Sequence, residues 1–419
     1  MTAPADATDV LIVGGGPAGL ATAIELARRE RRVTVIDRHD DAPGAATLLT
    51  PRAAAATRRL GIDLADHFHP IERIRITGID PDDPGMRSTS SRWPRLRGVP
   101  DIGYVGDRAA LVDALRGLAG SLGVRELDSH EATEPIVERG FVRGAVVRTP
   151  GGEHDEVRAT FTVVADGANS QFGRLLGTFR QPDWPLAVAY GGDYRSPLHL
   201  AGEAEIVVGI TDRAGAPIAG YGWMFPTGRG TVGVGLMLLS TSPSFQVINP
   251  SHLHERLLDE HGLRWQLDRD PVVAPSGGRV PLGGSVGPLA GPTFLIIGDA
   301  AAAANPLTGL GVDTALETGI MAGDVVGEAL DTANSAALQQ YPKLFDDRYG
   351  SYYKLGRLTA RLLGQPAFSR RVYEALASRP SYADSALRIA TQHLRSGRGG
   401  GPELLYRIAR AVAIFAPDA

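Results

Sequence analysis

Residues 9–37 read DVLIVGGGPAGLATAIELARRERRVTVID, and this stretch decides the fold. An apolar run, Val10 to Val13, leads into a glycine-rich turn, and a segment with helical periodicity then continues to Arg29. A second apolar run, Val33 to Ile36, ends on Asp37. The order predicts a strand, a tight turn, a helix and a second, parallel strand.

The turn has the residues that a dinucleotide's diphosphate requires. Gly14 permits a sharp turn, Gly16 lets the backbone approach a diphosphate, and Gly19 lets the helix pack closely on the sheet. Pro17 suits the first helical turn, where its missing N–H costs nothing. The first amides of the helix then face the diphosphate, and Asp37 can accept the hydroxyls of a ribose. We therefore predict that a dinucleotide binds here.

Composition limits the remaining possibilities. The chain has 419 residues, of which 43% are hydrophobic and 21% charged, and its net charge is −4. These values are typical of a globular protein and argue against a nucleic-acid partner. No run approaches the ~20 apolar residues of a membrane-spanning helix. The acidic start, MTAPADATD, lacks the apolar core of a signal peptide. We expect a cytoplasmic protein.

The chemistry must come from a bound cofactor. The chain has no cysteine, which excludes a redox-active disulfide and thiolate metal sites. Lys343 and Lys354 are its only lysines. The histidine pairs His67/His69 and His252/His254 are isolated, so we predict no metal site.

Two later segments can contribute to the same cofactor site. A buried run ending at Val164 is followed by ADGANS, which contains Asp166, and a second run at Phe294 to Ile297 leads into Gly298-Asp299 and a glycine-containing loop. A long helix is expected from about Val312 to Leu330. Arg108 begins another predicted helix, where it either is solvated or reaches the cofactor.

Between these segments the periodicity becomes that of strands, from Leu186 to Leu239. Tyr221, Trp223 and Phe225 alternate with small or aliphatic residues, so their rings should lie on one face of a strand. Such a row can be core packing or the flat wall of a binding site. A second glycine-rich nucleotide motif with flanking strand and helix is missing, which makes a separate nicotinamide domain improbable.

The predicted architecture is α/β. A Rossmann-like, discontinuous domain comprises residues 1–80, 101–182 and 276–332, and an antiparallel substrate domain comprises residues 81–100 and 183–275. Residues 81–100 are rich in Pro, Ser and Arg and read as a loop. Residues 333–419 form a helical region. Its last helix, Glu403 to Phe415, is amphipathic and fits either packing on the core or contact with a membrane surface.

Several motifs together resemble the geranylgeranyl reductase family of FAD-dependent oxidoreductases, which includes menaquinone and other polyprenyl reductases. They are GGGPAG at 14–19, VVADGANS at 163–170, YGWMFPTG at 221–228 and GDAAAAANPLTGLG at 298–311. The wider superfamily contains aromatic hydroxylases and flavin halogenases. The likeness covers residues 9–330 and is loose in the helical tail.

The resemblance implies an FAD-dependent enzyme that reduces a carbon–carbon double bond of a lipophilic, isoprenoid substrate. Tyr221, Trp223 and Phe225 would line the substrate pocket, and Tyr221 could donate a proton. The reductant would be NAD(P)H or a separate electron carrier, such as a reductase or ferredoxin. The residues implied in FAD binding are Gly14, Gly16, Pro17, Ala18, Gly19, Asp37, Arg38, Arg52, Arg108, Asp166, Asp299, Pro306, Gly309, Leu310, Gly311 and Val312.

Two alternatives stay open at this point. Family members usually have a Cys-Gly pair before the segment that is Pro51-Arg52 here, and residues 309–311 are Gly-Leu-Gly where relatives often have Gly-Glu-Gly. A flavin-dependent monooxygenase or other tailoring enzyme of secondary metabolism is one alternative. A non-redox flavoprotein that binds or cyclises a lipophilic substrate is the other. A halogenase is disfavoured because that branch relies on a lysine early in the chain.

Overall fold

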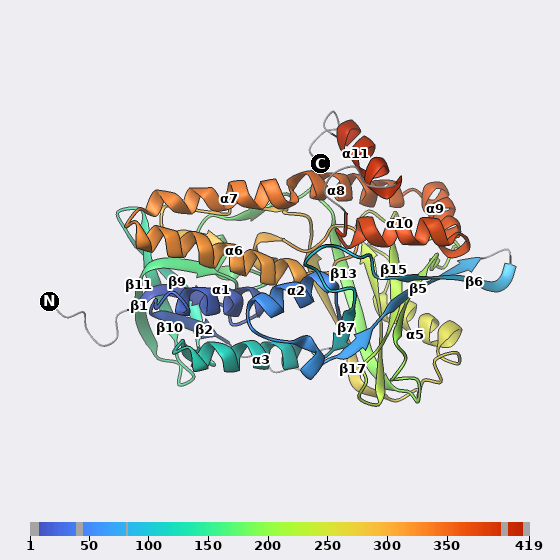
Figure 1. The fold of residues 1–419 in the computed structure, drawn as a ribbon, viewed down its shortest axis with the longest axis horizontal. Coiled ribbons are helices and arrows are strands. Elements are labelled where there is room, and N and C mark those ends of the chain that lie inside the picture. Colours follow the sequence, from blue (N-terminus) through green and yellow to red (C-terminus); the bar gives the residue numbers. More distant parts are fainter. Residues whose placement is uncertain (1–7, 39–44, 81–82, 395–400, 414–419) are drawn as a thin grey trace.

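The computed structural model describes residues 8–38, 45–80, 83–394 and 401–413. The acidic start of the chain, part of the loop before Pro51, most of the predicted linker at 397–402 and the last residues of the predicted amphipathic helix lie outside these ranges. Figure 1 shows an elongated molecule in which one sheet and its helices occupy the N-terminal end, and a second sheet stands at the opposite end.

The first sheet is built around strand β1, which is buried on both sides. Val10 and Ile12 pack in the core on the helix side, whereas Leu11 and Val13 pack in a second core on the other side. β1 pairs in parallel with β2, as the strand–turn–helix–strand pattern predicted, and it also pairs in parallel with β11. In order across the sheet the strands are β8 (Arg125–Asp128), β2 (Val33–Asp37), β1 (Thr8–Val13), β11 (His154–Val164), β10 (Phe141–Arg148) and β9 (Glu131–Glu138), with β19 (Phe294–Ile296) also paired to β11.

Helices α1 (Pro17–Ala27), α3 (Arg108–Ser121) and α6 (Val312–Asp331) pack on the helix side of this sheet. α1 and α6 approach closely because Gly319 has no side chain: a Cβ there would lie 2.3 Å from the carbonyl oxygen of Ala18. The hydroxyl of Thr22 also donates to the carbonyl of Gly319 over 3.0 Å. The part of α6 around Gly319 is therefore held beside the first two turns of α1.

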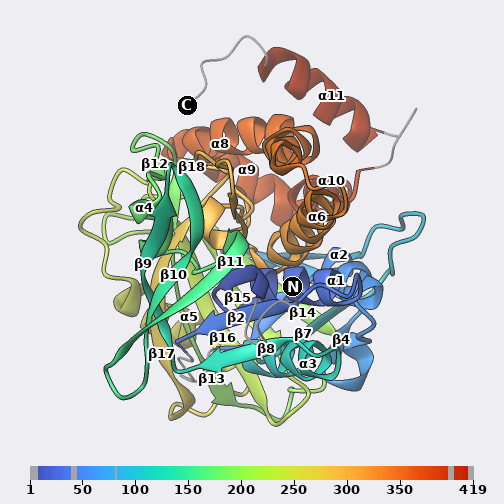
Figure 2. The same ribbon diagram turned by 90° about the vertical axis from the view of Figure 1, so that its left-hand side faces the viewer.

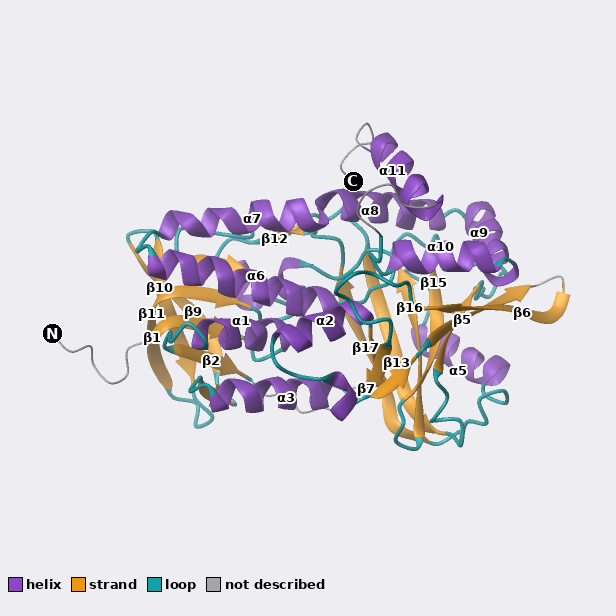
Figure 3. Ribbon diagram, viewed as in Figure 1, coloured by secondary structure: helices purple, strands orange, loops and turns teal. Residues whose placement is uncertain are grey.

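The second sheet has seven strands, and all its pairings are antiparallel except that of β14 with β5. Helix α5 (Pro250–His261) covers one face, and C-terminal helices cover the other, as Figure 3 shows. In order, its strands are β17 (Pro271–Pro281), β13 (Leu186–Arg195), β16 (Thr231–Leu239), β15 (Gly220–Pro226), β14 (Glu203–Val208), β5 (Arg73–Asp80) and β6 (Asp83–Arg92).

The remaining elements connect these layers or cover them. A small sheet contains β3 (Thr47–Leu49), β7 (Gly103–Gly106) and β4 (His69–Ile71), next to α2 (Pro51–Arg59). A two-stranded ribbon pairs β12 (Phe179–Arg180) with β18 (Val286–Gly287), next to α4 (Gln171–Leu175). Short 3₁₀ turns lie at Leu64–Asp66, Gly298–Ala301 and Ser335–Gln339, and a π-helical turn at Asp346–Gly350.

The C-terminal region is helical, as predicted: its first helix packs on α6, and later helices pack on the second sheet. It comprises α7 (Gln340–Phe345), α8 (Ser351–Leu363), α9 (Pro366–Ser378), α10 (Pro380–Ala390) and α11 (Gly401–Ala413). Figure 2 shows α11 as the outermost helix, resting on α8 and α10. The predicted α/β fold with an inserted antiparallel sheet and a helical C-terminal region is thus confirmed.

Two details differ from the sequence prediction. Residues 81–100 were expected to form a loop, but β6 occupies 83–92 and pairs with β5. In addition, two strands of the second sheet lie partly or wholly in ranges predicted for the cofactor domain: β5 ends at Asp80, within 1–80, and β17 crosses the predicted boundary at 275/276. β6 lies at the edge of its sheet, where proline, serine and arginine are tolerated. Because these residues are unusual in central strands, the sequence pattern did not indicate a strand here.

Candidate cofactor site and adjoining apolar cavity

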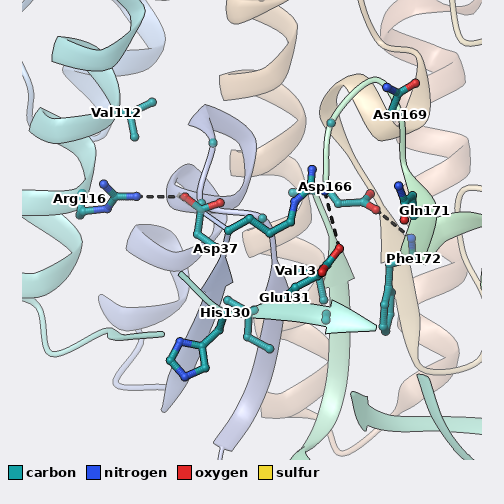
Figure 4. Close-up of a pocket in the computed structure, with 18 of the residues that line it drawn as sticks. Val13, Asp37, Val112, Arg116, His130, Glu131, Asp166, Asn169, Gln171 and Phe172 are labelled. Carbon is teal, nitrogen blue, oxygen red and sulfur yellow. Dashed lines mark hydrogen bonds and ion pairs between the residues drawn. The ribbon is translucent and has the colours of Figure 1, made fainter. Parts of the chain in front are cut away.

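A pocket of about 490 Å³ opens at the carboxyl ends of β1 and β2 (Figure 4). Ligands of parallel sheets bind at this edge because the loops there diverge from neighbouring strands. The pocket is lined by six of the predicted cofactor-binding residues: Gly14, Gly16, Asp37, Arg38, Arg108 and Asp166.

The glycines of the turn have distinct roles. Gly14 has φ of +111°, and a Cβ there would lie 2.3 Å from the carbonyl oxygen of Ala165. A Cβ on Gly19 would lie 2.0 Å from the carbonyl oxygen of Gly14. By contrast, a Cβ on Gly16 meets only Arg108 Nη2, at 3.9 Å, so the space beside Gly16 is open. Pro17, Ala18 and Gly19 form a first turn that no side chain caps, which leaves amides for an anionic ligand.

Two ion pairs fix the side chains of Asp37 and Arg38 in the pocket. The carboxylate of Asp37 lies 3.0 Å from Nη2 of Arg116, and Arg38 lies 3.7 Å from Glu131. Figure 4 shows Arg116 reaching Asp37 from α3. The sequence reasoning missed Arg116, although its spacing gives a signal: Arg108, Val112 and Arg116 recur every four residues, and all three line the pocket.

Arg108 lines the pocket, whereas Asp299 does not, although the two side chains interact through their charges. Asp299 is half-buried, at the 3₁₀ turn before α6, and its Oδ1 would lie 3.0 Å from a Cβ on Gly311. Burial raises the pKa of the Asp299 carboxyl, and the positive charge of Arg108 opposes that rise. Side-chain caps are also missing from the start of α6, at Gly311 and Val312. Two uncapped helix starts therefore contribute to this region.

Asp166 fixes the turn that follows β11. One oxygen of its carboxylate accepts a hydrogen bond from the backbone N–H of Phe172, over 2.9 Å, as Figure 4 shows. The other oxygen is buried and has no partner among the described residues. Burial raises the pKa of this carboxyl, while hydrogen bonds from Ser170 and Phe172 oppose the rise. The unpaired oxygen fits a site completed by a ligand with hydroxyl groups.

Arg52 does not line this pocket. Its buried guanidinium lies 2.9 Å (Nε) and 2.5 Å (Nη2) from the carboxylate of Glu317, and it also contacts Gln392. The side chain is thus engaged with Glu317, and its contact with a cofactor stays a prediction. This pairing is long-range: α2 and α6 meet across 265 residues of sequence.

The loop from Asn305 to Gly311 joins the cofactor region to the second sheet. Gly309 has φ of +65°, and a Cβ there would lie 2.4 Å from Sδ of Met237 on β16. Pro306 packs at the positions of Gly283 and Gly356, where a Cβ would lie 3.2 and 2.3 Å away. Leu310, unlike its glycine neighbours, lines a second cavity.

That cavity has a volume of about 840 Å³ and lies between the second sheet and the C-terminal helices. Its walls are almost entirely apolar. Aliphatic side chains of three strands form one wall, and α8, α9, α10 and α11 form the other. Its lining includes Leu48, Ile74, Ile76, Trp93, Ile206, Val208, Tyr221, Phe225, Leu239, Leu307, Thr308, Leu310, Tyr352, Leu355, Leu363, Phe368, Val372, Tyr373, Leu376, Leu387, Ile389 and Tyr406.

The aromatic row lies on the sheet face that borders this cavity. Tyr221 and Phe225 line it, whereas Trp223 stacks on Phe225, with ring centroids 5.7 Å apart. The indole fits over Gly235, where a Cβ would come within 2.3 Å of it. The Tyr221 hydroxyl donates to the carbonyl of Thr308, and burial raises the pKa of that phenol. Tyr221 thus ties the cavity wall to the loop at 305–311.

Asp193 is a buried acid on the same sheet face, and the sequence reasoning missed it. β13 pairs Asp193 with Gly233, which β16 pairs in turn with Phe225. Directly opposed residues share a face, so the carboxyl of Asp193 and the ring of Phe225 lie on one side of the sheet. Oδ1 accepts the backbone N–H of Ala46 over 2.9 Å, and burial raises the pKa of the acid. A lone aspartate within an apolar alternation is the signal that could have identified it.

Among the described residues, no cluster of three His, Asp or Glu side chains could hold a metal ion. None of the helices in that part of the chain combines the length and apolar character needed to cross a bilayer.

Comparison with protein families agrees with this geometry. Residues 7–184, which include the glycine turn, Arg108 and Asp166, match a family model described as an FAD binding domain. The open glycine turn, the two uncapped helix starts and the acids Asp37 and Asp166 of the pocket all fit FAD.

Similar proteins cover most of the chain. A menaquinone reductase of Mycobacterium tuberculosis is 36% identical over 376 residues, covering 87% of this chain and 86% of that protein. Digeranylgeranylglycerophospholipid reductase 2 of Methanopyrus kandleri is 29% identical and covers 85% and 87%. A geranylgeranyl bacteriochlorophyll reductase-like protein from Thermoplasma acidophilum has the same fold, with a TM-score of 0.75, 22% identity and coverage of 92% and 96%.

Proposed function

Because the chain belongs to the geranylgeranyl reductase family of FAD-dependent oxidoreductases, we propose that it saturates a carbon–carbon double bond in the isoprenoid chain of a lipophilic substrate. The relatives' names give the substrate class: a quinone with an isoprenoid tail or a geranylgeranyl lipid. A polyprenyl quinone is the preferred candidate because the more similar relative is a menaquinone reductase.

The main observation in support of this proposal is the apolar cavity. Its volume of about 840 Å³ is at the upper end of ordinary ligand pockets, and it offers almost no polar groups for orienting a polar ligand. Burial of an isoprenoid chain there is favoured by the hydrophobic effect, at about 25 cal/mol per Å² of apolar surface. Thr308 and Leu310, which border the cavity, belong to the loop that also reaches the cofactor region. We infer that this loop connects the two sites, because Gly311 at its end lies beside Asp299.

The residues of the glycine turn, with Asp37, Arg38, Arg108, Asp166 and Asp299, are proposed to hold FAD. When bound and reduced, FAD supplies a hydride to one alkene carbon. The protein's tasks are to hold the alkene in a dry cavity and to supply a proton to the other carbon. Tyr221 borders the cavity, but its hydroxyl is engaged with Thr308. Asp193 is the second candidate, because it lies on the same sheet face as Phe225, and burial raises the pKa of its carboxyl.

The electron donor is proposed to be NAD(P)H or a separate carrier protein. We also propose peripheral contact with a membrane through α11. Leu404 and Ile408 on that helix are 51% and 55% exposed, while Tyr406 and Ala409 line the cavity. A lipophilic substrate could therefore pass from a lipid surface into the cavity beside this helix.

The direct test supplies electrons chemically. The holoenzyme is reduced with dithionite under nitrogen and incubated with a menaquinone, and the product is analysed by mass spectrometry. We expect a product with two additional hydrogen atoms in its isoprenoid tail. A product that forms only with oxygen and contains an added oxygen atom would instead establish a monooxygenase. No change in any polyprenyl compound tested would refute the reductase.

A further inference from the structure

A third pocket, of about 260 Å³, is lined by residues of α4, of β12 and β18, and of the end of β17. It collects three guanidinium groups from three different elements: Arg174 on α4, Arg180 on β12 and Arg279 on β17. Asn169, Ser170 and Thr178 add hydrogen-bonding groups, and the lining contains no carboxylate. The pocket therefore has the composition of an anion site.

The positive charge of this pocket is not neutralised locally. Among the described residues, Arg174 and Arg279 form no ion pair. Arg180 donates to the backbone carbonyls of Trp184 and Pro182, over 2.9 and 3.2 Å, and these acceptors carry no net charge. In the cofactor pocket, by contrast, arginines face carboxylates such as Asp37 and Glu131. Uncompensated guanidinium groups in one concave site attract anions.

This pocket adjoins the cofactor pocket, so we expect its ligand to lie near the cofactor. Asn169 lines both this pocket and the cofactor pocket, and Ala168 and Ser170 belong to the same turn. The lining of the apolar cavity shares no residue with it. A head group of the isoprenoid substrate is therefore a poor candidate, whereas an anionic partner of the flavin fits.

Phe179, which lies next to Arg180, further limits the class of anion that the pocket can bind. Phe179 lines the pocket, is 58% exposed and directly precedes Arg180. An exposed phenyl ring can stack on an adenine, and guanidinium groups bind phosphate oxygens at two points. The volume is below the ~300 Å³ lower bound of complete ligand pockets, which suits one end of a dinucleotide.

We propose that Arg174, Arg180 and Arg279 bind phosphate groups of a nicotinamide dinucleotide reductant, with NADPH preferred over NADH. This inference rests on the proposed function, since it names the source of the electrons. Three guanidinium groups match the diphosphate together with the additional 2′-phosphate of NADPH. A chain without a second glycine-rich nucleotide motif could then still bind such a reductant, because the three arginines would bind its phosphate groups.

Binding of redox-inert NADP⁺ and NAD⁺ to the oxidised holoenzyme tests the proposal. Isothermal titration is expected to give at least a tenfold lower Kd for NADP⁺ than for NAD⁺. Arg279→Gln should weaken NADP⁺ binding by about tenfold or more, as expected for loss of a charge-assisted hydrogen bond. Arg195→Gln is the matched control on the second sheet, because Arg195 is 68% exposed and faces Asp268 instead. Its Kd for NADP⁺ should equal that of the wild type.

Arg174→Gln, on a separate element, repeats the test if Arg279→Gln fails to fold, and flavin absorbance checks that each variant keeps FAD. Wild-type Kd values for NADP⁺ in both variants would overturn the proposal. The absence of NADP⁺ binding to the wild type would overturn it as well. Because the assay contains no isoprenoid substrate, its outcome is independent of the dithionite test of the proposed function.

Discussion

Arg52 and Glu317 form a two-point ion pair between α2 and α6, with Nε to Oε1 at 2.9 Å and Nη2 to Oε2 at 2.5 Å. Both side chains are almost buried, and Tyr349 donates to the same carboxylate. Burial opposes ionisation of Glu317, but the charge and hydrogen bonds of Arg52 prevail and lower its pKa to about 2. The pair is therefore charged and holds the two helices together.

Removing one partner should destabilise the protein strongly. Arg52→Met leaves a buried carboxylate without its main partner, so we expect the free energy of unfolding to fall by about 3–5 kcal/mol. The double variant Arg52→Met/Glu317→Leu should recover much of this loss. Urea denaturation of the three proteins measures both effects. Loss of FAD binding in Arg52→Met with wild-type stability would contradict this and would favour direct contact with the cofactor.

Substitutions in the glycine turn should affect protein stability and FAD affinity differently, depending on the glycine that is replaced. Gly16→Ala places a methyl group in open space, so the apoprotein should keep its stability while FAD binding weakens by at least tenfold. Gly19→Ala forces a methyl group against the carbonyl of Gly14, so it should lower both. Gly117→Ala, on exposed α3, is the control. It meets no atom within 4 Å and should stabilise the protein by roughly 0.5–1 kcal/mol.

Local signals in the sequence predicted the cofactor half of the site. The glycine turn, Asp37, Arg108 and Asp166 lie in segments whose strand or helix pattern is strong, and the sheet brings the ends of those strands together. Arg116 could have been predicted in the same way, because it lies two helical turns after Arg108 on the same face of α3. The position of the aromatic row on one face of β15 also followed from the period of a strand.

Long-range packing explains what sequence reasoning missed. No local pattern indicates that Arg52 meets Glu317, or that α8 to α11 close a cavity over the face of β15. Asp193 is one acid in a strand, and only the pairing of β13 with β16 places it beside Gly233. The arginine pocket unites residues separated by about a hundred positions, which each look like ordinary surface arginines in the sequence.

A bulky side chain within the apolar cavity should impair use of long substrates. Ala386→Trp projects an indole from α10 into the cavity, so we expect kcat/KM for a long-tailed menaquinone to fall at least tenfold, with a smaller loss for a short-tailed one. Ala367→Trp on α9 is exposed and lies outside the cavity, so it should behave like the wild type. Equal losses for both chain lengths would argue that the cavity does not hold the tail.

Contact between α11 and a membrane can be measured by flotation with vesicles that contain an anionic lipid. Leu404→Asp/Ile408→Asp replaces two exposed apolar residues, so the variant should float less than the wild type because burying charge in lipid is unfavourable. Leu263→Asp, at an 89% exposed position before β17, is the control and should float normally. Identical flotation of all three proteins would refute a role for α11.

The last prediction concerns acid stability. His393 is completely buried, with Nδ1 2.7 Å from Thr391 Oγ1, and its Nε2 has no partner among the described residues. Burial and the positive charge of Arg52 lower the pKa of His393 to about 4. The ordinary value in the unfolded chain is ~6.5. The unfolded state therefore binds a proton more readily, and stability is lost as pH falls from 6.5 towards 4.

The loss should approach about 3 kcal/mol at pH 4, from 1.36 kcal/mol for each unit of pKa difference. His254 and His261 act in the same direction because burial also lowers their pKa values. The comparison with His393→Gln isolates the contribution of His393, since this variant should have a shallower dependence of unfolding free energy on pH between 6.5 and 4. Urea denaturation at several pH values measures the slope. Parallel curves for wild type and variant would show that His393 titrates alike in both states, which would contradict its burial as a neutral imidazole.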